Sequence, residues 1–306
     1  MHEPMQRPDW IALDWGAARL RAWLMRADGS VIDTRLARAG ADEPGAVGVE
    51  PALLALVADA LGDDGGSGQP VPVLCCGLAG ARQAVPFVAV PAPPPSSQAA
   101  VRIETRDPRL DLRALPGMKQ DSPADVMQGE GTIVAGALAV QPGFDGVFCL
   151  PGEQTRWVHV SAGEIVSFRT FMTGELFALL SRHSVLRHHV GDGTGWDGAA
   201  FDAGVGDAMA RPQRIGAALF GIRAAGLLQG LSSGAARARL SGLLIGLELA
   251  GSRPHWLGQD IRVLGTGGLA RAYRAALSAQ AASVQTMDAD DLTLRGLRAA
   301  YEGTTG

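Results

Sequence analysis

The chain has 306 residues, of which 47% are hydrophobic and 19% are charged, and this composition indicates a globular protein with a sizeable core. The length favours two domains over one. A net charge of −4 provides no positive surface for nucleic acid or anionic lipid, so we expect neither as a partner.

The first ten residues carry acidic and basic side chains and two prolines, without the apolar centre of a signal peptide. No run reaches the roughly 18 consecutive apolar residues that spanning a membrane requires. Cys75, Cys76 and Cys149 are an odd number of thiols, and adjacent cysteines in a strand have the wrong geometry for a mutual disulfide. We therefore expect buried, reduced cysteines in a soluble, cytoplasmic protein.

The predicted order at the start of the chain is strand, strand, strand, helix. Apolar and alternating runs predict strands over residues 11–14, 19–26 and 31–36. The first strand ends in the turn Trp15-Gly16, and Asp28-Gly29 supplies a hairpin turn. After Pro51 in the sequence, apolar side chains recur at helical spacing, which predicts a helix.

A continuous apolar run over residues 71–76 is typical of a buried central strand. Residues 91–95 are rich in proline and predict a stiff surface connection. The mixed polar residues 105–123 predict a passage between two domains. We therefore place the boundary near Lys119, which divides the chain into lobes of residues 1–119 and 120–306.

The second half repeats the order of the first. Strands are predicted over residues 146–150, through Trp157 and over residues 165–168. The first of them ends in the turn Pro151-Gly152, and Thr173 is placed to cap a following helix. In the first half, the turn glycines Gly16 and Gly29 are 13 residues apart. In the second half, Gly152 and Gly163 are 11 residues apart. This similar spacing indicates a duplicated unit.

The rest of the chain predicts an open α/β arrangement. Its elements are helices over residues 214–229 and 235–250, a strand over 261–264, a helix over 269–279, a strand near Val284 and a helix after Asp290.

Three glycine-bearing turns follow predicted strands: Asp14-Trp15-Gly16, Pro151-Gly152 and Gly265-Thr266-Gly267-Gly268. Glycine lets backbone N–H groups approach an anion, so three such turns facing a shared cleft would cradle a nucleotide. An ordinary tight turn is the alternative for each. No Gly-Lys-Ser or Gly-Lys-Thr follows any of them, and the full dinucleotide fingerprint is missing. A dinucleotide-dependent dehydrogenase is therefore the weaker alternative.

Two acidic residues are candidates for the chemistry. Asp14, at the end of the first strand, is placed to bind Mg²⁺ through water, because this ion prefers few carboxylates; a turn-capping role is the alternative. Glu130 lies between two glycines at the start of an apolar helix, where it can take a proton from a hydroxyl that attacks the γ-phosphate. The alternative for Glu130 is a favourable interaction with the helix dipole.

Arg82 and Gln83 follow the buried central strand, where a guanidinium could bind a substrate carboxylate through two hydrogen bonds. An exposed loop arginine is an equal alternative. His183, His188 and His189 lie on or just beyond a predicted helix without an acid at ligand spacing, so we expect no metal site there.

Six segments resemble the 2-dehydro-3-deoxygalactonokinases in order and spacing. They are IALDWGAARLRAWL, DVMQGEGTIVAGAL, LPGEQTRWV, FRTFMTGELFALLSRHSVL, RAAGLLQGLSS and RLSGLLIGLELA. The resemblance covers nearly the whole chain and implies a duplicated ribonuclease H-like (actin-like ATPase) α/β fold, with two lobes flanking a nucleotide cleft. It also implies that ATP and Mg²⁺ serve to phosphorylate the terminal hydroxyl of 2-dehydro-3-deoxy-D-galactonate, in galactonate catabolism.

The same resemblance implies roles for the candidate residues. The first phosphate loop contains Asp14, Gly16 and Ala17, the second contains Gly152, and the adenosine loop contains Gly265, Thr266 and Gly267. Glu130 is similar in position to the family's catalytic base, and Arg82-Gln83 to the pair that contacts the substrate.

Both phosphate loops depart from the family's usual pattern. Ala17, Ala18 and Arg19 stand where hydroxyl-bearing residues and asparagine are usual, and Glu153 adds a negative charge to the second loop. These changes leave a second reading open, in which a kinase-like protein binds a sugar acid or a nucleotide without catalysis. The epimer of the substrate and the choice between a monomer and a homodimer also stay open.

Overall fold

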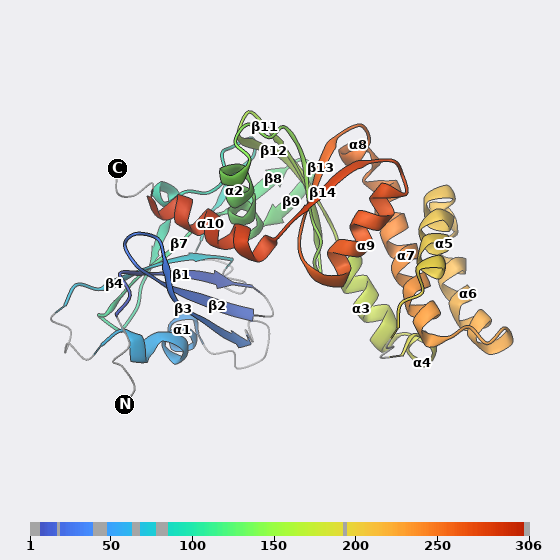
Figure 1. The fold of residues 1–306 in the computed structure, drawn as a ribbon, viewed down its shortest axis with the longest axis horizontal. Coiled ribbons are helices and arrows are strands. Elements are labelled where there is room, and N and C mark those ends of the chain that lie inside the picture. The colour runs from blue at the N-terminus through green and yellow to red at the C-terminus, as the bar shows by residue number, and fades with distance from the viewer. Residues whose placement is uncertain are drawn as a thin grey trace. The chain divides into compact units, whose positions relative to one another are not determined.

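The computed structural model describes residues 7–16, 19–38, 48–62, 68–77, 85–191 and 195–302 (Figure 1). It divides the chain into two compact units. Unit 1 comprises residues 1–144, 163–165 and 289–306, and unit 2 comprises residues 145–162 and 166–288. Residues 120–144 and 289–306, which the sequence analysis assigns to the second lobe, thus belong to unit 1.

Unit 1 is built on a six-stranded sheet in the order β3-β2-β1-β4-β7-β6. Its strands are β1 (Trp10–Trp15), β2 (Arg19–Met25), β3 (Val31–Arg38), β4 (Val71–Cys76), β6 (Val101–Ile103) and β7 (Leu110–Ala114). Strand β1 pairs antiparallel with β2 and parallel with β4, and β4 continues parallel to β7. The expected three-stranded meander and buried central strand are confirmed.

The central strands are mostly apolar, as strands covered on both faces of a sheet usually are, and Asp14 near the end of β1 is the exception among the residues of β1 and β4. Side chains alternate between the faces, so that Ile11 and Leu13 of β1 pack on one side with helix α1 (Val49–Val57). Trp10 and Ala12 pack on the other side with helix α10 (Ala289–Glu302), where the Trp10 ring stacks on Tyr301 at 4.0 Å. Short 3₁₀ turns over Ala58–Ala60 and Ser97–Ala99 complete this part of the unit.

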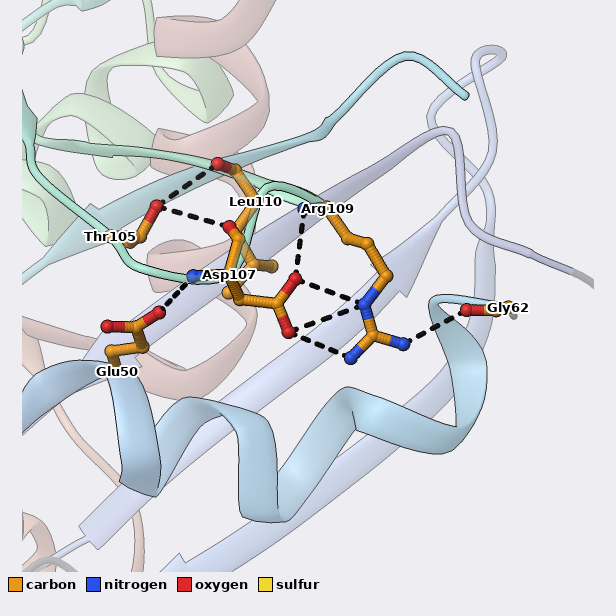
Figure 2. A network of polar contacts seen from close by, with 6 residues as sticks. All are labelled: Glu50, Gly62, Thr105, Asp107, Arg109 and Leu110. Atoms are coloured by element: carbon orange, nitrogen blue, oxygen red, sulfur yellow. Dashed lines mark hydrogen bonds and ion pairs between the residues drawn. The ribbon is translucent and has the colours of Figure 1, made fainter. Parts of the chain in front are cut away.

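The polar segment from residue 105 onward does not form a passage between domains. Figure 2 shows the hydrogen bonds that hold this segment within unit 1. The Asp107 N–H donates to the Glu50 carboxylate of α1 at 2.6 Å, and Arg109 binds the Asp107 carboxylate. Arg109 also donates to the carbonyl of Gly62 at 3.0 Å. These contacts hold the start of β7, which then enters the main sheet beside β4.

A second, three-stranded sheet of unit 1 was not anticipated. It has the order β5-β8-β9, formed by β5 (Phe87–Ala89), β8 (Gly117–Asp121) and β9 (Ala124–Met127). Strand β9 leads directly into helix α2 (Glu130–Val140), which packs against α10. Glycine allows the close approach, since a Cβ at Gly136 would overlap the Leu292 carbonyl and a Cβ at Gly296 would overlap that of Thr132.

Unit 2 repeats the strand order of unit 1. Its sheet runs β12-β11-β10-β13-β14, with β10 (Gly146–Leu150), β11 (Thr155–Ser161), β12 (Glu164–Phe171), β13 (Asp260–Leu264) and β14 (Ser283–Met287). Again the first strand pairs antiparallel with the second and parallel with the fourth. The duplicated ribonuclease H-like fold expected from the sequence is therefore confirmed.

The helices of unit 2 are α3 (Thr173–His183), α4 (Arg187–Val190), α5 (Gly198–Ala210), α6 (Ile215–Leu228), α7 (Ser233–Gly251), α8 (Arg253–Trp256) and α9 (Gly267–Ser278), with a 3₁₀ turn over Pro212–Arg214. The predicted helices α6, α7 and α9 are confirmed, whereas α5 was missed. Thr173 does not cap α3, because Met172 is the N-cap residue and the Thr173 hydroxyl donates to Glu248 instead. All three cysteines are buried free thiols, as predicted.

Among the helices formed by the described residues, none combines the length and the apolarity that crossing a membrane would require.

We expect Gly136→Ala to lower the free energy of unfolding by at least about 2 kcal/mol, because the new methyl group would push α2 away from α10. Urea denaturation followed by circular dichroism measures this. Gly221→Ala in α6 is the matched control, since nothing lies within 4 Å of the position. It should be neutral or add about 0.5–1 kcal/mol through helix propensity. Equal effects of the two variants would contradict the close packing.

Candidate active site

In unit 1, the candidate residues lie where the parallel strands β1 and β4 end. Asp14 on β1 is in register with Cys76 on β4 and with Arg21 on β2. The carboxyl ends of parallel strands meet at one edge of a sheet, and ligands of open α/β folds bind at such edges. The turn after β1 is closed by the Gly16 N–H, which donates to the carbonyl of Arg19 at 2.9 Å.

Glycine contacts bring the start of helix α2 to the same edge. Gly77, directly after β4, has a φ of 92°, and a Cβ there would overlap the carbonyl of Trp15. A Cβ at Gly129 would lie only 3.4 Å from the Cα of Gly77. The ends of β1 and β4 and the N-terminus of α2 are thus in backbone contact, and Glu130 is the first residue of α2.

The Cys76 thiol lies beside one of the candidate carboxylates. It donates to Asp14 Oδ1 at 3.9 Å. Burial raises the pKa of the Cys76 thiol well above its ordinary value, and the negative charges of Asp14 and Glu130 add to this effect. Asp14 and Glu130 thus lie on backbone segments that are in contact at this edge, and the Cys76 thiol beside Asp14 stays protonated and inert as a nucleophile.

Burial also raises the pKa of Asp14, while the positive charges of Arg19 and Arg21 lower it in part. A further positive charge beside this carboxylate would favour its ionised form. Glu130 is held differently, because its Oε2 accepts hydrogen bonds from the backbone N–H groups of Gln128 at 3.0 Å and Gly129 at 3.1 Å. These two bonds orient the carboxylate over the first turn of α2.

The predicted second phosphate loop, in unit 2, is held by the N-terminus of α3. A Cβ at Gly174 would overlap the carbonyl of Gly152, and the Glu175 N–H donates to the carbonyl of Glu153 at 2.8 Å. The Glu153 side chain is exposed. The loop is thus fixed through its backbone, and Glu153 lines the same cavity as Gly152.

The predicted third loop joins β13 to α9. The Gly265 N–H donates to the carbonyl of Met287 at 2.9 Å, which ties the loop to β14. Gly267 begins α9 with a φ of 75°, and Thr266 is its N-cap residue without a side-chain capping bond. The N–H groups at the start of α9 therefore have no capping side chain from Thr266.

Unit 2 contains a cavity of about 550 Å³ between these two loops and helices α3 and α7. Gly152 lines it from the second loop and Gly268 from the third. The other walls combine apolar and polar side chains, among them Phe177, Ser181, Arg237, Ser241 and Leu244. The Arg237 guanidinium stacks on the Phe177 ring at 4.9 Å. A cavity of this size and mixed lining suits a small organic ligand with polar groups.

A buried carboxylate on α7 supports one wall of this cavity. Glu248 accepts hydrogen bonds from Trp157 Nε1 at 2.8 Å and from the Tyr273 hydroxyl at 2.6 Å. It also accepts one from the hydroxyl of Thr173, which lines the cavity beside Gly174. Tyr273 in turn shares a hydrogen bond of 2.8 Å with Thr155. Glu248 thereby links β11, α9 and the N-terminus of α3 through one side chain.

The three loops are predictable from the sequence, whereas the residues that hold them were not predicted. Gly174 and Glu248 lie within two segments that resemble the family, FRTFMTGELFALLSRHSVL and RLSGLLIGLELA, and an acidic residue within the apolar run of α7 was the available signal. Ala17, Arg82 and Gln83 lie outside the described residues. Within the described ranges, no group of three or more His, Cys, Asp or Glu side chains is arranged to hold a metal ion.

The comparisons with known proteins give one consistent result. The model of the 2-keto-3-deoxy-galactonokinase family matches residues 14–300. The chain is 35% identical over 307 residues to a protein of Rhizobium meliloti (strain 1021) assigned as a 2-dehydro-3-deoxygalactonokinase, covering 95% of this chain and 96% of the relative. It is 30% identical over 300 residues to the 2-dehydro-3-deoxygalactonokinase of Escherichia coli (strain K12), covering 94% and 96%.

A solved structure agrees with these sequence matches. The crystal structure of a Sinorhizobium meliloti protein assigned as a 2-dehydro-3-deoxygalactonokinase superposes with a TM-score of 0.85 at 34% identity. The match covers 97% of this chain and 99% of that chain.

We expect Glu248→Ala to lower the free energy of unfolding by at least about 3 kcal/mol, because it leaves a cavity and three donors without their acceptor. Urea denaturation followed by tryptophan fluorescence measures the loss. Glu248→Gln keeps the volume and one acceptor oxygen, so it should lose less. A loss below about 1 kcal/mol for the alanine variant, the range of ordinary surface changes, would contradict a supporting role.

The stability difference between the native chain and Glu248→Gln should depend on pH. Burial raises the pKa of Glu248 above its ordinary value of 4.5, although four hydrogen bonds lower it in part. The folded chain therefore keeps this proton at pH values where the unfolded chain has lost it. The stability that this proton-binding difference adds to the native chain is full below about pH 4.5. It declines as pH rises through the folded pKa of Glu248. Denaturation at a series of pH values should show the native chain losing stability relative to the glutamine variant, and a constant difference would refute this.

Proposed function

Because the chain belongs to the 2-keto-3-deoxy-galactonokinase family, we infer that it is a carbohydrate kinase that phosphorylates 2-dehydro-3-deoxy-D-galactonate with ATP, in galactonate catabolism. The group that accepts the phosphoryl group is the terminal hydroxyl of the sugar acid, and the reaction takes place in the cytoplasm. The observation in the structure that supports this proposal is the backbone contact among the ends of β1 and β4 and the start of α2, the segments that carry Asp14 and Glu130.

The cavity of unit 2 is the proposed site for the adenosine part of ATP. Phe177 and Leu244 offer apolar contacts to a base, while Ser241 and Arg237 offer polar contacts to a base or a ribose. Backbone N–H groups at Gly152, Thr266 and Gly267 would bind phosphate oxygens, because both loops contain glycine and α9 begins at Gly267.

The donor set around Asp14 fits a magnesium ion bound through water. Mg²⁺ keeps most of its water and takes few carboxylates, and Asp14 offers a single carboxylate whose ionised form an added cation would favour. When bound, the ion would neutralise charge on the triphosphate. The Asp14 carboxylate would accept hydrogen bonds from two or more of the ion's waters, and the Cys76 thiol and the sheet edge hold its orientation.

Glu130 is the proposed general base. Its carboxylate accepts two backbone hydrogen bonds, which orient it at the start of α2, and one of its oxygens would meet the substrate hydroxyl. This oxygen would take the proton as the hydroxyl oxygen attacks the γ-phosphorus. Arg82 and Gln83 are proposed to bind the carboxylate of the sugar acid, a role that rests on the resemblance alone.

The non-catalytic alternative rests on the altered phosphate loops. The backbone of the second loop is held by α3 whatever side chain stands at Glu153, and backbone N–H groups need no hydroxyl to bind phosphate. The carboxylates proposed for metal binding and proton transfer are both present. These observations favour an active kinase.

Glu130→Gln should lower kcat by about 10²- to 10⁴-fold, because the amide cannot take the proton, while KM for ATP stays within a few-fold. A coupled assay that follows ADP formation from ATP, Mg²⁺ and 2-dehydro-3-deoxy-D-galactonate measures both constants. Glu164→Gln, at an exposed glutamate that begins β12, is the control and should keep full activity. If Glu130→Gln turns over like the native chain, Glu130 is not the base. No turnover by the native chain together with no heat of ATP binding would end the kinase proposal.

Asp14→Asn should lower kcat by about 100-fold or more and raise the Mg²⁺ concentration needed for half-maximal activity, because an amide holds the ion's waters less strongly. Titration of Mg²⁺ at saturating ATP in the same assay measures the shift. An unchanged Mg²⁺ requirement would remove Asp14 from the metal site.

A further inference from the structure

Two arginines converge on one carboxylate beside the first loop of unit 1. Arg21 donates to Asp290 Oδ2 at 2.9 Å, and Arg19 donates to Asp290 Oδ1. Asp290 lies in the first turn of α10, so it joins the C-terminal helix to strand β2. Burial raises the pKa of the Asp290 carboxyl, but the bonds from Arg21 and Arg19 outweigh it and hold the pKa below its ordinary value.

The two arginines differ in their exposure to solvent. The Arg21 side chain is 10% exposed and lies over the ring of Trp23 at 5.2 Å, so it is fixed in place. The Arg19 side chain is 50% exposed, and its partner Asp290 is 40% exposed. Ion pairs with this exposure contribute little to stability, so a stronger anion can replace Asp290 on Arg19 at little cost. Arg21 would still hold Asp290 after that exchange.

Arg19 is also the cation best placed to serve a ligand at the first loop. Its backbone carbonyl closes the loop by accepting the hydrogen bond from Gly16. Its partner Asp290 is also bound by Arg21, which stands opposite Asp14 in the pairing of β1 with β2. The exchangeable guanidinium is therefore close to the carboxylate that the proposed function assigns to the metal and phosphate end of ATP.

We propose that Arg19 is a phosphate-binding residue, which exchanges Asp290 for the terminal phosphate of the bound triphosphate. This assignment rests on the proposed function. The side chains of Ala17 and Ala18 offer no hydroxyl donors to phosphate, whereas a guanidinium presents several N–H donors in a fork that matches phosphate oxygens. A terminal phosphate carries more charge than a carboxylate, so it competes well for Arg19. When no nucleotide is bound, the ion pair with Asp290 holds the Arg19 side chain beside the loop.

Calorimetric titration with AMP, ADP and a non-hydrolysable ATP analogue, each with Mg²⁺, tests the assignment. Arg19→Ala should weaken binding of the ATP analogue by about 10- to 100-fold, the range of a lost charge-assisted hydrogen bond, and should leave AMP within twofold. Arg19→Lys keeps the charge and should recover part of the loss. Equal affinity of the native chain and Arg19→Ala for the ATP analogue would overturn the assignment.

Two further variants separate phosphate binding from a structural role. Asp290→Ala removes the same ion pair but leaves Arg19, so affinity for the ATP analogue should stay within twofold or rise. An equal loss in Asp290→Ala and Arg19→Ala would show that the ion pair itself matters, and would overturn the proposal. Arg295→Ala, which removes a similarly exposed ion pair with Asp291 on the same helix, should change no affinity. If the native chain binds none of the three nucleotides, the proposed function fails together with this inference, whereas loss of the Arg19 effect alone leaves the function standing.

Discussion

Close backbone contact at glycine residues is the constraint on which both candidate sites depend. In unit 1, the backbone of Gly77 touches that of Trp15 and Gly129, so two strand ends and one helix start meet at a single edge. In unit 2, Gly174 places the N-terminus of α3 directly against the carbonyl of Gly152. A side chain at Gly77 or Gly174 would separate these segments by the width of a methyl group. The polar groups that they carry would then no longer converge.

The duplicated fold explains why each unit offers a loop at an equivalent place. In both units the first strand ends beside a parallel fourth strand and turns back into an antiparallel second strand. The two copies have then diverged in what surrounds the loop. Unit 1 adds the carboxylates of Asp14 and Glu130, which suits proton and metal chemistry. Unit 2 adds a cavity with apolar walls and the buried support of Glu248, which suits retention of a ligand.

Charge is balanced locally at the first loop. Asp14 and Asp290 are two carboxylates, and Arg19 and Arg21 are two guanidinium groups within reach of them. A triphosphate that bound there without a metal ion would add uncompensated negative charge. The proposed exchange of partners by Arg19 and the proposed binding of hydrated Mg²⁺ by Asp14 would both reduce this cost, and both residues lie within the same unit. The loop's lack of hydroxyl side chains is therefore compatible with phosphate binding.

Local patterns in the sequence determined the strands, the hairpin turns, most long helices and the positions of the three glycine turns. Those features follow from side-chain alternation, helical spacing and turn chemistry, which act over a few residues. Tertiary structure alone decided that α2 packs on α10 and so belongs to unit 1, and that Thr173 binds Glu248 instead of capping α3. It also decided that residues 110–114 form a sheet strand. These outcomes depend on contacts between segments far apart in the chain, and no local pattern encodes such a contact.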